Sequence, residues 1–358
     1  MHSPEASRNT GPGIKPPKSS RSLKTAVSLA LVLALAGAVF YLLDPAGLFR
    51  TKQFAGPREA LTLGLAHESL AALAMIARDR GYFSEAGLDV TVKGYKSGSL
   101  AMKGLLAGDV AMTTAADIPI VFESMARRDF RIVATIGSSD NEPRIIARKD
   151  RDVKVPADLR GKRIATQKAS AVHFFLHVFL LQNGMTAEDV TLSFLKPDDL
   201  VKTLVDGEID AFSMREPYIS QAAKQLGDNA LVFEKPGLYR KTFNVVVTAD
   251  LLKNRPEVVR RAMHALVQAE AFAQKHPNQA IQIVAKVLES PPADIAAIWP
   301  DSVLKVSLDQ SLLVSLEDEA KWVIGSKLAE TTETPNYLEM VHVGSLKAVA
   351  PFLVSLIH

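Results

Sequence analysis

From residue 60 onward, strand-like and helix-like patterns alternate along the chain, and this alternation constrains the fold more than any other feature of the sequence. Apolar runs of four or five residues are separated by stretches in which apolar residues recur every three or four positions. This order of elements is typical of an α/β domain with mostly parallel strands. We predict strands at 61–65, 88–92, 110–113, 132–136, 163–167, 191–195, 210–214 and 244–248.

Helical segments lie between and after these strands. Segment 69–80 carries apolar residues at i, i+3, i+4 and i+7 from Leu70, as an amphipathic helix does. Segment 170–182 is apolar nearly all round, which predicts a largely buried helix with Ser170 as its N-cap. Beyond residue 254 the pattern is helical almost throughout, so we expect a helical C-terminal tail that packs back on the α/β units.

The N-terminal part has a different character. Residues 1–22 are rich in Pro, Ser and Gly, which predicts a disordered basic tail. Within segment 23–43, residues 25–43 carry no charge, and a helix of that length spans about 28 Å, close to a bilayer core. A cleaved signal peptide and an uncleaved transmembrane anchor both fit, and the length of the apolar run favours the anchor. Residues 44–59 contain Pro and Gly and are interpreted as a linker.

The charge of the chain is distributed unevenly. The formal net charge is +3, but residues 1–43 hold five basic side chains and one acidic side chain, a net of +4, so the remaining residues carry −1. Basic residues before an apolar helix place the N-terminus in the cytoplasm. We therefore expect the body of the chain on the periplasmic side of the cytoplasmic membrane. If the apolar segment is cleaved, the body would be free in the periplasm. A nearly neutral body argues against nucleic acid as a partner, because phosphate neutralisation dominates such binding.

The chain has no cysteine. This excludes a disulfide scaffold, a cysteine nucleophile, a thiolate metal site and a lipid attached to an N-terminal cysteine. The sequence also has no Gly-x-Ser-x-Gly elbow, no phosphate-binding P-loop and no dinucleotide fingerprint. We therefore predict a protein that is not an enzyme and that uses no cofactor.

Five segments together resemble a known family. They are 77–92 (ARDRGYFSEAGLDVTV), the Leu-x-x-Gly-Asp-Val unit at 105–110, 157–173 (ADLRGKRIATQKASAVH), Arg-Glu-Pro-Tyr at 215–218 and Asn-Tyr at 336–337. In this order they are similar to the nitrate, sulfonate and taurine group of ABC-importer solute-binding proteins, which shares its fold with the thiamine-pyrimidine synthases of fungi. The resemblance covers roughly residues 60–352.

The resemblance implies a type II periplasmic-binding-protein fold, with two α/β lobes that close on a ligand in the cleft between them. Lobe 1 would comprise residues 60–145 and 240–358, and lobe 2 residues 146–239. The implied function is capture of a small anion such as nitrate, a sulfonate or taurine, and its delivery to an ABC permease and ATPase complex. We expect a monomer that is tethered to the membrane by its N-terminal helix.

Two other functions remain open. One is an enzyme on the same fold with dehydratase-like activity, which would require a strongly raised pKa on Glu68, Asp117 or Glu216. The cysteine-dependent chemistry of the pyrimidine synthases is excluded because the chain lacks cysteine. The other is a membrane-anchored sensor that binds a ligand and signals through a separate protein.

The ligand site follows from the strand order. In open α/β sheets, ligands bind beyond the carboxyl ends of the strands. This rule selects the loops 66–69, 95–99, 114–117, 137–139 with 168–173, and 215–218. The candidate ligand-binding residues in these loops are His67, Glu68, Ser97, Gly98, Ser99, Thr114, Asp117, Ser138, Lys168, Ser170, Ala171, His173, Arg215 and Glu216.

Charge and hydrogen bonding suggest roles for several of these residues. The Ser-Gly-Ser run at 97–99 and the Ser-Ala pair at 170–171 each precede a helix, so their hydroxyls and free N–H groups suit an oxyanion. Arg215 supplies a cation able to make bidentate contacts, although an ion pair with Glu216 is the structural alternative. The family often has Trp where this chain has Arg215.

Two histidines four residues apart, His173 and His177, could share a helical face as metal ligands do. The sequence offers no third ligand nearby, so we predict no metal site. The interpretation we prefer is that His173 reaches the cleft and that His177 is an interior histidine.

Overall fold

The computed structural model describes residue 54 and residues 56–357. The predicted disordered tail, the predicted transmembrane or signal segment and most of the predicted linker lie outside these residues. Among the helices of the described part, none combines the length and the apolar character that crossing a bilayer requires.

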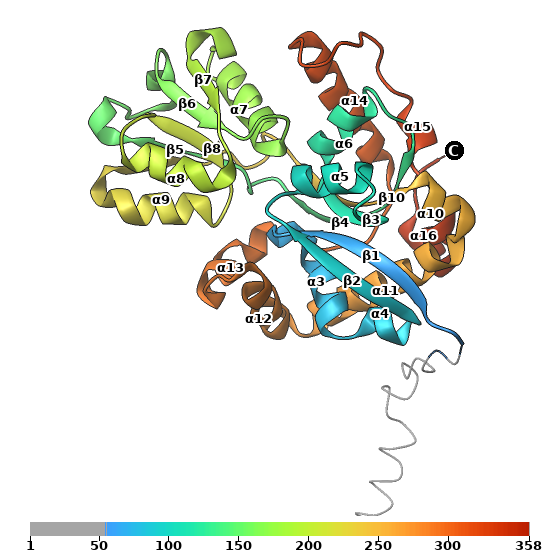
Figure 1. The fold of residues 1–358 in the computed structure, drawn as a ribbon. Helices are drawn as coiled ribbons and strands as arrows, with labels where there is room; N and C mark the ends of the chain where they lie inside the picture. The colour runs from blue at the N-terminus through green and yellow to red at the C-terminus, as the bar shows by residue number, and fades with distance from the viewer. Residues whose placement is uncertain (1–53, 55, 358) are drawn as a thin grey trace, which may run out of the picture. The chain divides into compact units, whose positions relative to one another are not determined.

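Two five-stranded sheets form the framework of the described residues (Figure 1). The first has the order β2-β1-β3-β10-β4, and β10 runs antiparallel to its two neighbours, whereas β1 is parallel to β2 and to β3. Its strands are β1 (Glu59–Ala66), β2 (Leu88–Tyr95), β3 (Met112–Ala116), β4 (Phe130–Ser139) and β10 (Lys241–Thr248).

The second sheet has the order β7-β6-β8-β5-β9. Here β6 is parallel to β7 and to β8, and β5 runs antiparallel to both of its neighbours. Its strands are β5 (Arg144–Arg148), β6 (Arg163–Thr166), β7 (Thr191–Phe194), β8 (Ala211–Met214) and β9 (Ala230–Phe233). We call each sheet with its helices a lobe, the first and the second lobe.

Helices cover both faces of each sheet, with α5 and α6 opposite α3, α4 and α11 in the first lobe and α7 opposite α8 and α9 in the second (Figure 1). The helices of the second lobe are α7 (Ala171–Gln182), α8 (Pro197–Val205) and α9 (Tyr218–Leu226). The other helices are α3 (Ala72–Asp79), α4 (Tyr82–Glu85), α5 (Gly98–Leu106), α6 (Asp117–Ser124), α10 (Ala249–Asn254), α11 (Pro256–Lys275), α12 (Pro277–Leu288), α13 (Pro292–Ile298), α14 (Gln310–Gly325), α15 (Tyr337–Met340) and α16 (Gly344–Val349). Short 3₁₀ turns are η1 (Ser69–Ala71), η2 (Lys149–Arg151), η3 (Pro156–Leu159), η4 (Ala187–Asp189), η5 (Gly227–Asn229), η6 (Trp299–Asp301) and η7 (Pro351–Leu353).

The α/β architecture predicted from the sequence is confirmed, and each of the eight predicted strands overlaps an observed one. The strand predicted at 110–113 was placed too early, because β3 spans Met112–Ala116. Strands β5 and β9 were missed. They are only five and four residues long, and pairing rather than a local pattern makes them strands: β5 pairs with β8 and with β9, and β9 pairs with β5.

Two short connections join the lobes. The first, residues 140–143, leads from β4 to β5, and the second, residues 234–240, leads from β9 to β10. The expected domain boundary between residues 145 and 146 lies inside β5, which belongs to the second sheet. The helical segments after β10 pack on the first lobe, where α11 contacts α3 and α14 contacts α6.

The second lobe has a small apolar core of its own around β8, its central strand. Phe212 on β8 is fully buried there, whereas Phe352 in η7 is 83% exposed. Close packing makes the loss of a large buried side chain costly, because the surrounding residues refill the space only in part.

We predict that Phe212→Ala lowers the free energy of unfolding by about 3–5 kcal/mol, because it removes a large apolar side chain from this core. Phe352→Ala is the matched control and should change it by less than about 0.5 kcal/mol. Urea unfolding monitored by circular dichroism measures both values. Equal effects of the two substitutions would contradict the assignment of Phe212 to the core.

Candidate functional site

A buried carboxylate lies where the two lobes meet. Glu68 follows β1 and is 4% exposed. Its Oε2 atom lies 3.1 Å from Nε of Arg215, which follows β8, and accepts a hydrogen bond of 2.7 Å from Nζ of Lys241, the first residue of β10. Its Oε1 atom accepts a 2.7 Å hydrogen bond from the backbone N–H of Gly98 at the start of α5.

A second carboxylate completes this arrangement. Glu142, in the first connection, accepts two hydrogen bonds from Nζ of Lys241, at 2.8 and 2.9 Å. Glu68, Glu142, Arg215 and Lys241 therefore form a buried network of two acids and two bases, which we call the charge network. Its side chains are 1–8% exposed, and its formal charge is zero.

The network sets the ionisation of its members. Burial alone would raise the pKa of Glu68, but the charges of Arg215 and Lys241 and the hydrogen bonds from Lys241 and Gly98 outweigh burial and lower the pKa to about 2. Burial alone would lower the pKa of Lys241, but Glu142 and Glu68 raise it above its ordinary value. Glu68 and Lys241 are therefore charged at neutral pH.

A small cavity lies beside the charge network, and we call it the inner cavity. Its volume is about 10 Å³. It is lined by residues of both lobes, namely Glu68, Ser97, Ser99, Ala116, Pro119, Gln167, Ser170, Ala171, Val172, Arg215 and Lys241. Six of the predicted site residues are among them: Glu68, Ser97, Ser99, Ser170, Ala171 and Arg215.

The N-termini of two helices approach the inner cavity. Ser97 caps α5 by accepting a hydrogen bond from the Leu100 N–H, and Ser170 precedes α7. Nε2 of Gln167 donates to Oγ of Ser97 at 3.0 Å across the two lobes, while Oε1 of Gln167 is buried without a hydrogen-bond partner. The two helices expected after Ser97 and Ser170 thus begin at this cavity, from opposite lobes. Gln167, which was not among the predicted site residues, connects the two lobes by its hydrogen bond to Ser97.

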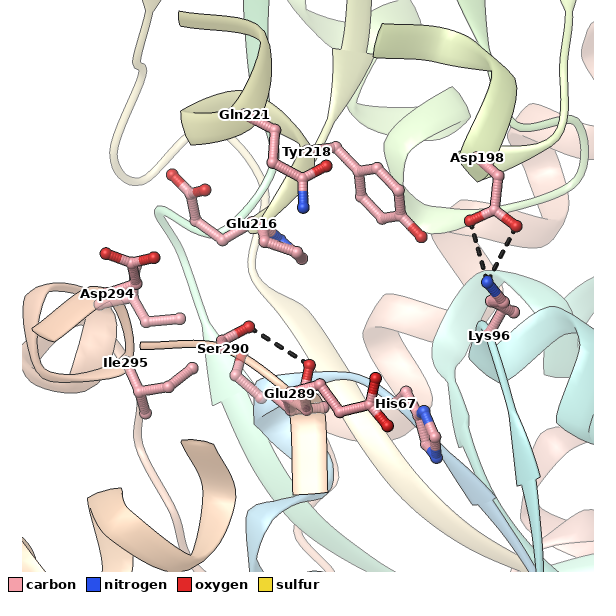
Figure 2. A pocket seen from close by; sticks show the side chains of 14 residues that line it. His67, Lys96, Asp198, Glu216, Tyr218, Gln221, Glu289, Ser290, Asp294 and Ile295 are labelled. Atoms are coloured by element: carbon pink, nitrogen blue, oxygen red, sulfur yellow. Dashed lines mark hydrogen bonds and ion pairs between the residues drawn. The ribbon is translucent and has the colours of Figure 1, made fainter. Parts of the chain in front are cut away.

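A larger cavity, the outer cavity, has a volume of about 440 Å³ and also involves both lobes (Figure 2). Its lining residues are His67, Ser69, Lys96, Asp198, Glu216, Pro217, Tyr218, Gln221, Leu288, Glu289, Ser290, Asp294, Ile295 and Ile298. Figure 2 shows the ion pair of Lys96 with Asp198 at one side of it, 2.9 Å between Nζ and Oδ2. Burial lowers the pKa of His67, so this predicted site residue is neutral at pH 7.

Glu216 does not pair with Arg215. Glu216 lies in the turn between β8 and α9 and faces the outer cavity, 3.7 Å from Nη1 of Arg144. The structural alternative of an Arg215–Glu216 ion pair is therefore wrong, because Glu68 is the partner of Arg215.

His173 belongs to an aromatic cluster behind the inner cavity. Its ring lies 4.9 Å from that of Phe194 and 5.2 Å from that of Trp322 on α14, and its Nδ1 atom has no hydrogen-bond partner. Burial lowers the pKa of His173 to about 4, with smaller contributions from His177 and Lys168. His177 is half-buried against the same Trp322. Within residues 56–357, no group of three or more potential ligands is arranged to hold a metal ion.

The remaining predicted residues have other places. Thr114 Oγ1 accepts a hydrogen bond from the Ala66 N–H, and Lys168 is exposed with its ammonium over the ring of Phe194. Ser138 lines a third cavity of about 120 Å³ and accepts a hydrogen bond from Arg240.

Asp117 lies inside the first lobe and is fully buried. Its carboxylate accepts hydrogen bonds from the Ile118 N–H, the Tyr239 hydroxyl, and the N–H and hydroxyl of Thr242. Burial raises its pKa, and the hydrogen bonds counteract this only in part. Its contacts tie the start of α6 to the second connection.

Sequence reasoning missed Lys241, Glu142 and Gln167. The strand containing Lys241 was predicted to begin at residue 244, three residues too late, so its first residue was not considered. Glu142 lies in a connection with no regular pattern, and Gln167 was assigned to the end of a strand. The usable signal was the charge of Lys241 four residues before the apolar run at 245–247.

Known proteins share sequence similarity with this chain. The NMT1/THI5-like family matches residues 71–280. A putative aliphatic sulfonates-binding protein of Bacillus subtilis is 27% identical over 218 residues, which cover 60% of this chain and 65% of the relative. The taurine-binding periplasmic protein of Escherichia coli is 24% identical over 215 residues, covering 59% and 66%. The matched region thus spans slightly less than two thirds of the length of these relatives.

Solved structures show the same fold. The periplasmic aliphatic sulphonate binding protein SsuA of Escherichia coli has a TM-score of 0.68 at 20% identity, covering 79% of this chain and 92% of that one. The alkanesulfonate-binding protein SsuA of Xanthomonas axonopodis pv. citri has a TM-score of 0.70 at 21% identity, covering 81% and 100%. The predicted type II periplasmic-binding-protein fold of the described residues is confirmed.

The resemblance inferred from the five sequence segments is likewise confirmed by these relatives. The family match extends over more than half of the residues, from α3 in the first lobe to α12. The chain therefore belongs to the NMT1/THI5-like family.

Proposed function

We propose that this protein is the extracytoplasmic solute-binding component of an ABC importer and that its ligand is a small anion of the sulfonate, taurine or nitrate kind. The ligand would bind between the lobes, and lobe closure would present the loaded protein to a permease and ATPase complex. Ligand binding stabilises the closed arrangement through contacts that exist only when both lobes meet.

The observation that carries this proposal is the set of groups around the inner cavity. Helices α5 and α7 begin there from opposite lobes, with the Ser97 and Ser170 hydroxyls and the Arg215 guanidinium beside them. Helix N-termini and guanidinium groups bind oxyanions through N–H donors and positive charge. The names of the relatives, which include sulfonate-binding and taurine-binding proteins, support the same ligand class.

The relatives include a periplasmic protein, which supports a location outside the cytoplasmic membrane. We infer that the apolar segment 25–43 directs this export and remains as an anchor, because it is long for a signal peptide. Membrane fractionation of the native host tests this: the anchor requires the protein in the membrane fraction with its first residues intact, whereas a shortened protein in the periplasmic fraction would show cleavage.

The enzyme alternative receives little support from the carboxylates on which it depends. A general acid needs a raised pKa, and the charge network lowers that of Glu68 to about 2. Asp117 has a raised pKa, but its carboxylate is occupied by hydrogen bonds inside the first lobe. We therefore propose a binding protein that performs no covalent chemistry.

We predict that the purified protein binds at least one of taurine, ethanesulfonate, hexanesulfonate and nitrate in isothermal titration. Arg215→Met should weaken that binding by about 100-fold, because it removes the guanidinium from the inner cavity. Arg163→Met is the matched control, since Arg163 pairs with Asp210 outside both cavities. Absence of binding to all four compounds, or equal binding by the two variants, would contradict the proposed site.

A second prediction concerns pH. The pKa of Glu68 in the folded state, about 2, lies below its ordinary value of 4.5, so the charge network stabilises the fold fully above pH 4.5. This stabilisation is lost as the pH falls from 4.5 toward 2, and it amounts to about 3 kcal/mol. Glu68→Gln should therefore lose less stability than the wild type over this range.

Urea unfolding at pH 7, 5, 4 and 3 measures the difference between the two proteins. Glu317→Gln, which removes an exposed acid from α14, is the control for the loss of one surface charge. A difference between wild type and Glu68→Gln that stays constant across the four pH values would contradict the low pKa of Glu68.

A further inference from the structure

The carboxylate of Glu68 is bound in the way that an oxyanion ligand would be bound. It accepts hydrogen bonds from the Gly98 N–H at the start of α5 and from Nζ of Lys241, both at 2.7 Å, and it forms an ion pair with Arg215 at 3.1 Å from Nε. A helix N-terminus, a guanidinium and an ammonium group are the donors that proteins commonly use for oxyanions. Two of these donors belong to the first lobe, and Arg215 belongs to the second.

The positive charges near the inner cavity are already neutralised by carboxylates. Lys241 is shared by Glu68 and Glu142, while Arg215 contacts Glu68 through Nε and donates from Nη2 to the Lys96 carbonyl at 3.2 Å. Two acids thus balance two bases within the charge network. An additional anion beside it would bring net negative charge into a buried region, which is costly.

The inner cavity is also too small for an anionic group. Its volume of about 10 Å³ suffices for about one water molecule. A sulfonate group contains a sulfur and three oxygen atoms, so it can enter only if Glu68 and Arg215 move apart.

The two cavities adjoin each other along three pairs of consecutive residues. His67, Lys96 and Glu216 line the outer cavity, and their neighbours Glu68, Ser97 and Arg215 line the inner one. A ligand with its anionic group at Arg215 can therefore extend its remaining atoms into the outer cavity, whose volume of about 440 Å³ suits a small organic molecule.

We propose that Glu68 sets an affinity threshold for ligands by occupying the position of the ligand's anionic group, so that a ligand binds only by displacing this carboxylate from Arg215. The inference rests on the proposed function, because it takes an anionic ligand in the cleft as given. Displacement costs a buried ion pair, and the ligand offsets that cost with contacts in the outer cavity. The ligand class is therefore an organic anion, and a bare inorganic anion such as nitrate is discriminated against.

Isothermal titration of the full chain with sodium nitrate and sodium hexanesulfonate tests this. The wild type should bind nitrate at least about tenfold more weakly than hexanesulfonate. Glu68→Gln removes the competing charge and should tighten nitrate binding by about tenfold or more, and it should tighten hexanesulfonate binding as well. Adding Arg215→Met to Glu68→Gln should abolish the gain.

Asp210→Asn is the matched control. Asp210 is also a buried acid, 6% exposed, and it pairs with Arg163 at 2.6 Å outside both cavities. This variant removes the same charge from a buried acid whose partner Arg163 is 43% exposed, so it should bind both anions as the wild type does. A gain in Asp210→Asn equal to that in Glu68→Gln would overturn the inference, since the effect would then come from overall charge.

Glu68→Gln leaves every other member of the charge network with a partner. The amide oxygen can accept the Gly98 N–H, Lys241 keeps Glu142, and Arg215 keeps the Lys96 carbonyl. If this variant does not fold, Glu68→Asp retains the charge on a shorter side chain that reaches less far toward Arg215. It should show a smaller gain in the same direction.

Failure of the inference differs from failure of the proposed function. If the wild type binds an anion and Glu68→Gln binds it no more tightly, the competing role of Glu68 is wrong and the proposed function stands. If the wild type binds hexanesulfonate and only Glu68→Gln also binds nitrate, the inference is supported in its strongest form. If no variant binds nitrate, hexanesulfonate, ethanesulfonate or taurine, both are wrong.

Discussion

Four charged side chains buried between the lobes impose a strict requirement, because an ionised group removed from water must be neutralised where it lies. Glu68, Glu142, Arg215 and Lys241 meet this requirement only together. They come from the end of β1, the first connection, the end of β8 and the start of β10. The charge network therefore joins both lobes and the segments that connect them at one point.

The surroundings of the network follow from this arrangement. The first N–H group of helix α5, that of Gly98, donates to the Glu68 carboxylate. Glu68 and Arg215 line the inner cavity, and their chain neighbours His67 and Glu216 line the outer cavity. Behind them, Trp322 of the first lobe packs against His173 and Phe174 of α7. Movement of the lobes would disturb a polar contact and an apolar contact at once, so the cost of opening depends on both.

Much of the framework could be predicted from the sequence, and the site only in part. The local order of apolar residues is enough to predict strands such as β1 and the buried helix α7, because in these elements it follows which side chains are buried. The rule that ligands bind beyond the carboxyl ends of strands also selected Ser97, Ser170 and Arg215, and these three residues line one cavity. Contacts between residues far apart in the sequence could not be predicted from local patterns. The contacts of Lys241 with Glu68 and Glu142 span 173 and 99 residues.

The same limitation applies to Arg215, for which Glu216 was the alternative partner to a ligand. The fold turns the Glu216 side chain toward the outer cavity and brings Glu68 to Arg215 from the other lobe. A charge that looked available for a ligand is therefore already neutralised by the protein.

We propose that the Glu68 carboxylate and the anionic group of the ligand compete for one position at Arg215. A crystal structure of the protein with bound hexanesulfonate distinguishes the possibilities. We expect the sulfonate oxygens to contact the Arg215 guanidinium, Glu68 to have turned away from it, and the hexyl chain to lie in the outer cavity. A structure in which Glu68 still pairs with Arg215 while the sulfonate binds elsewhere would contradict this proposal.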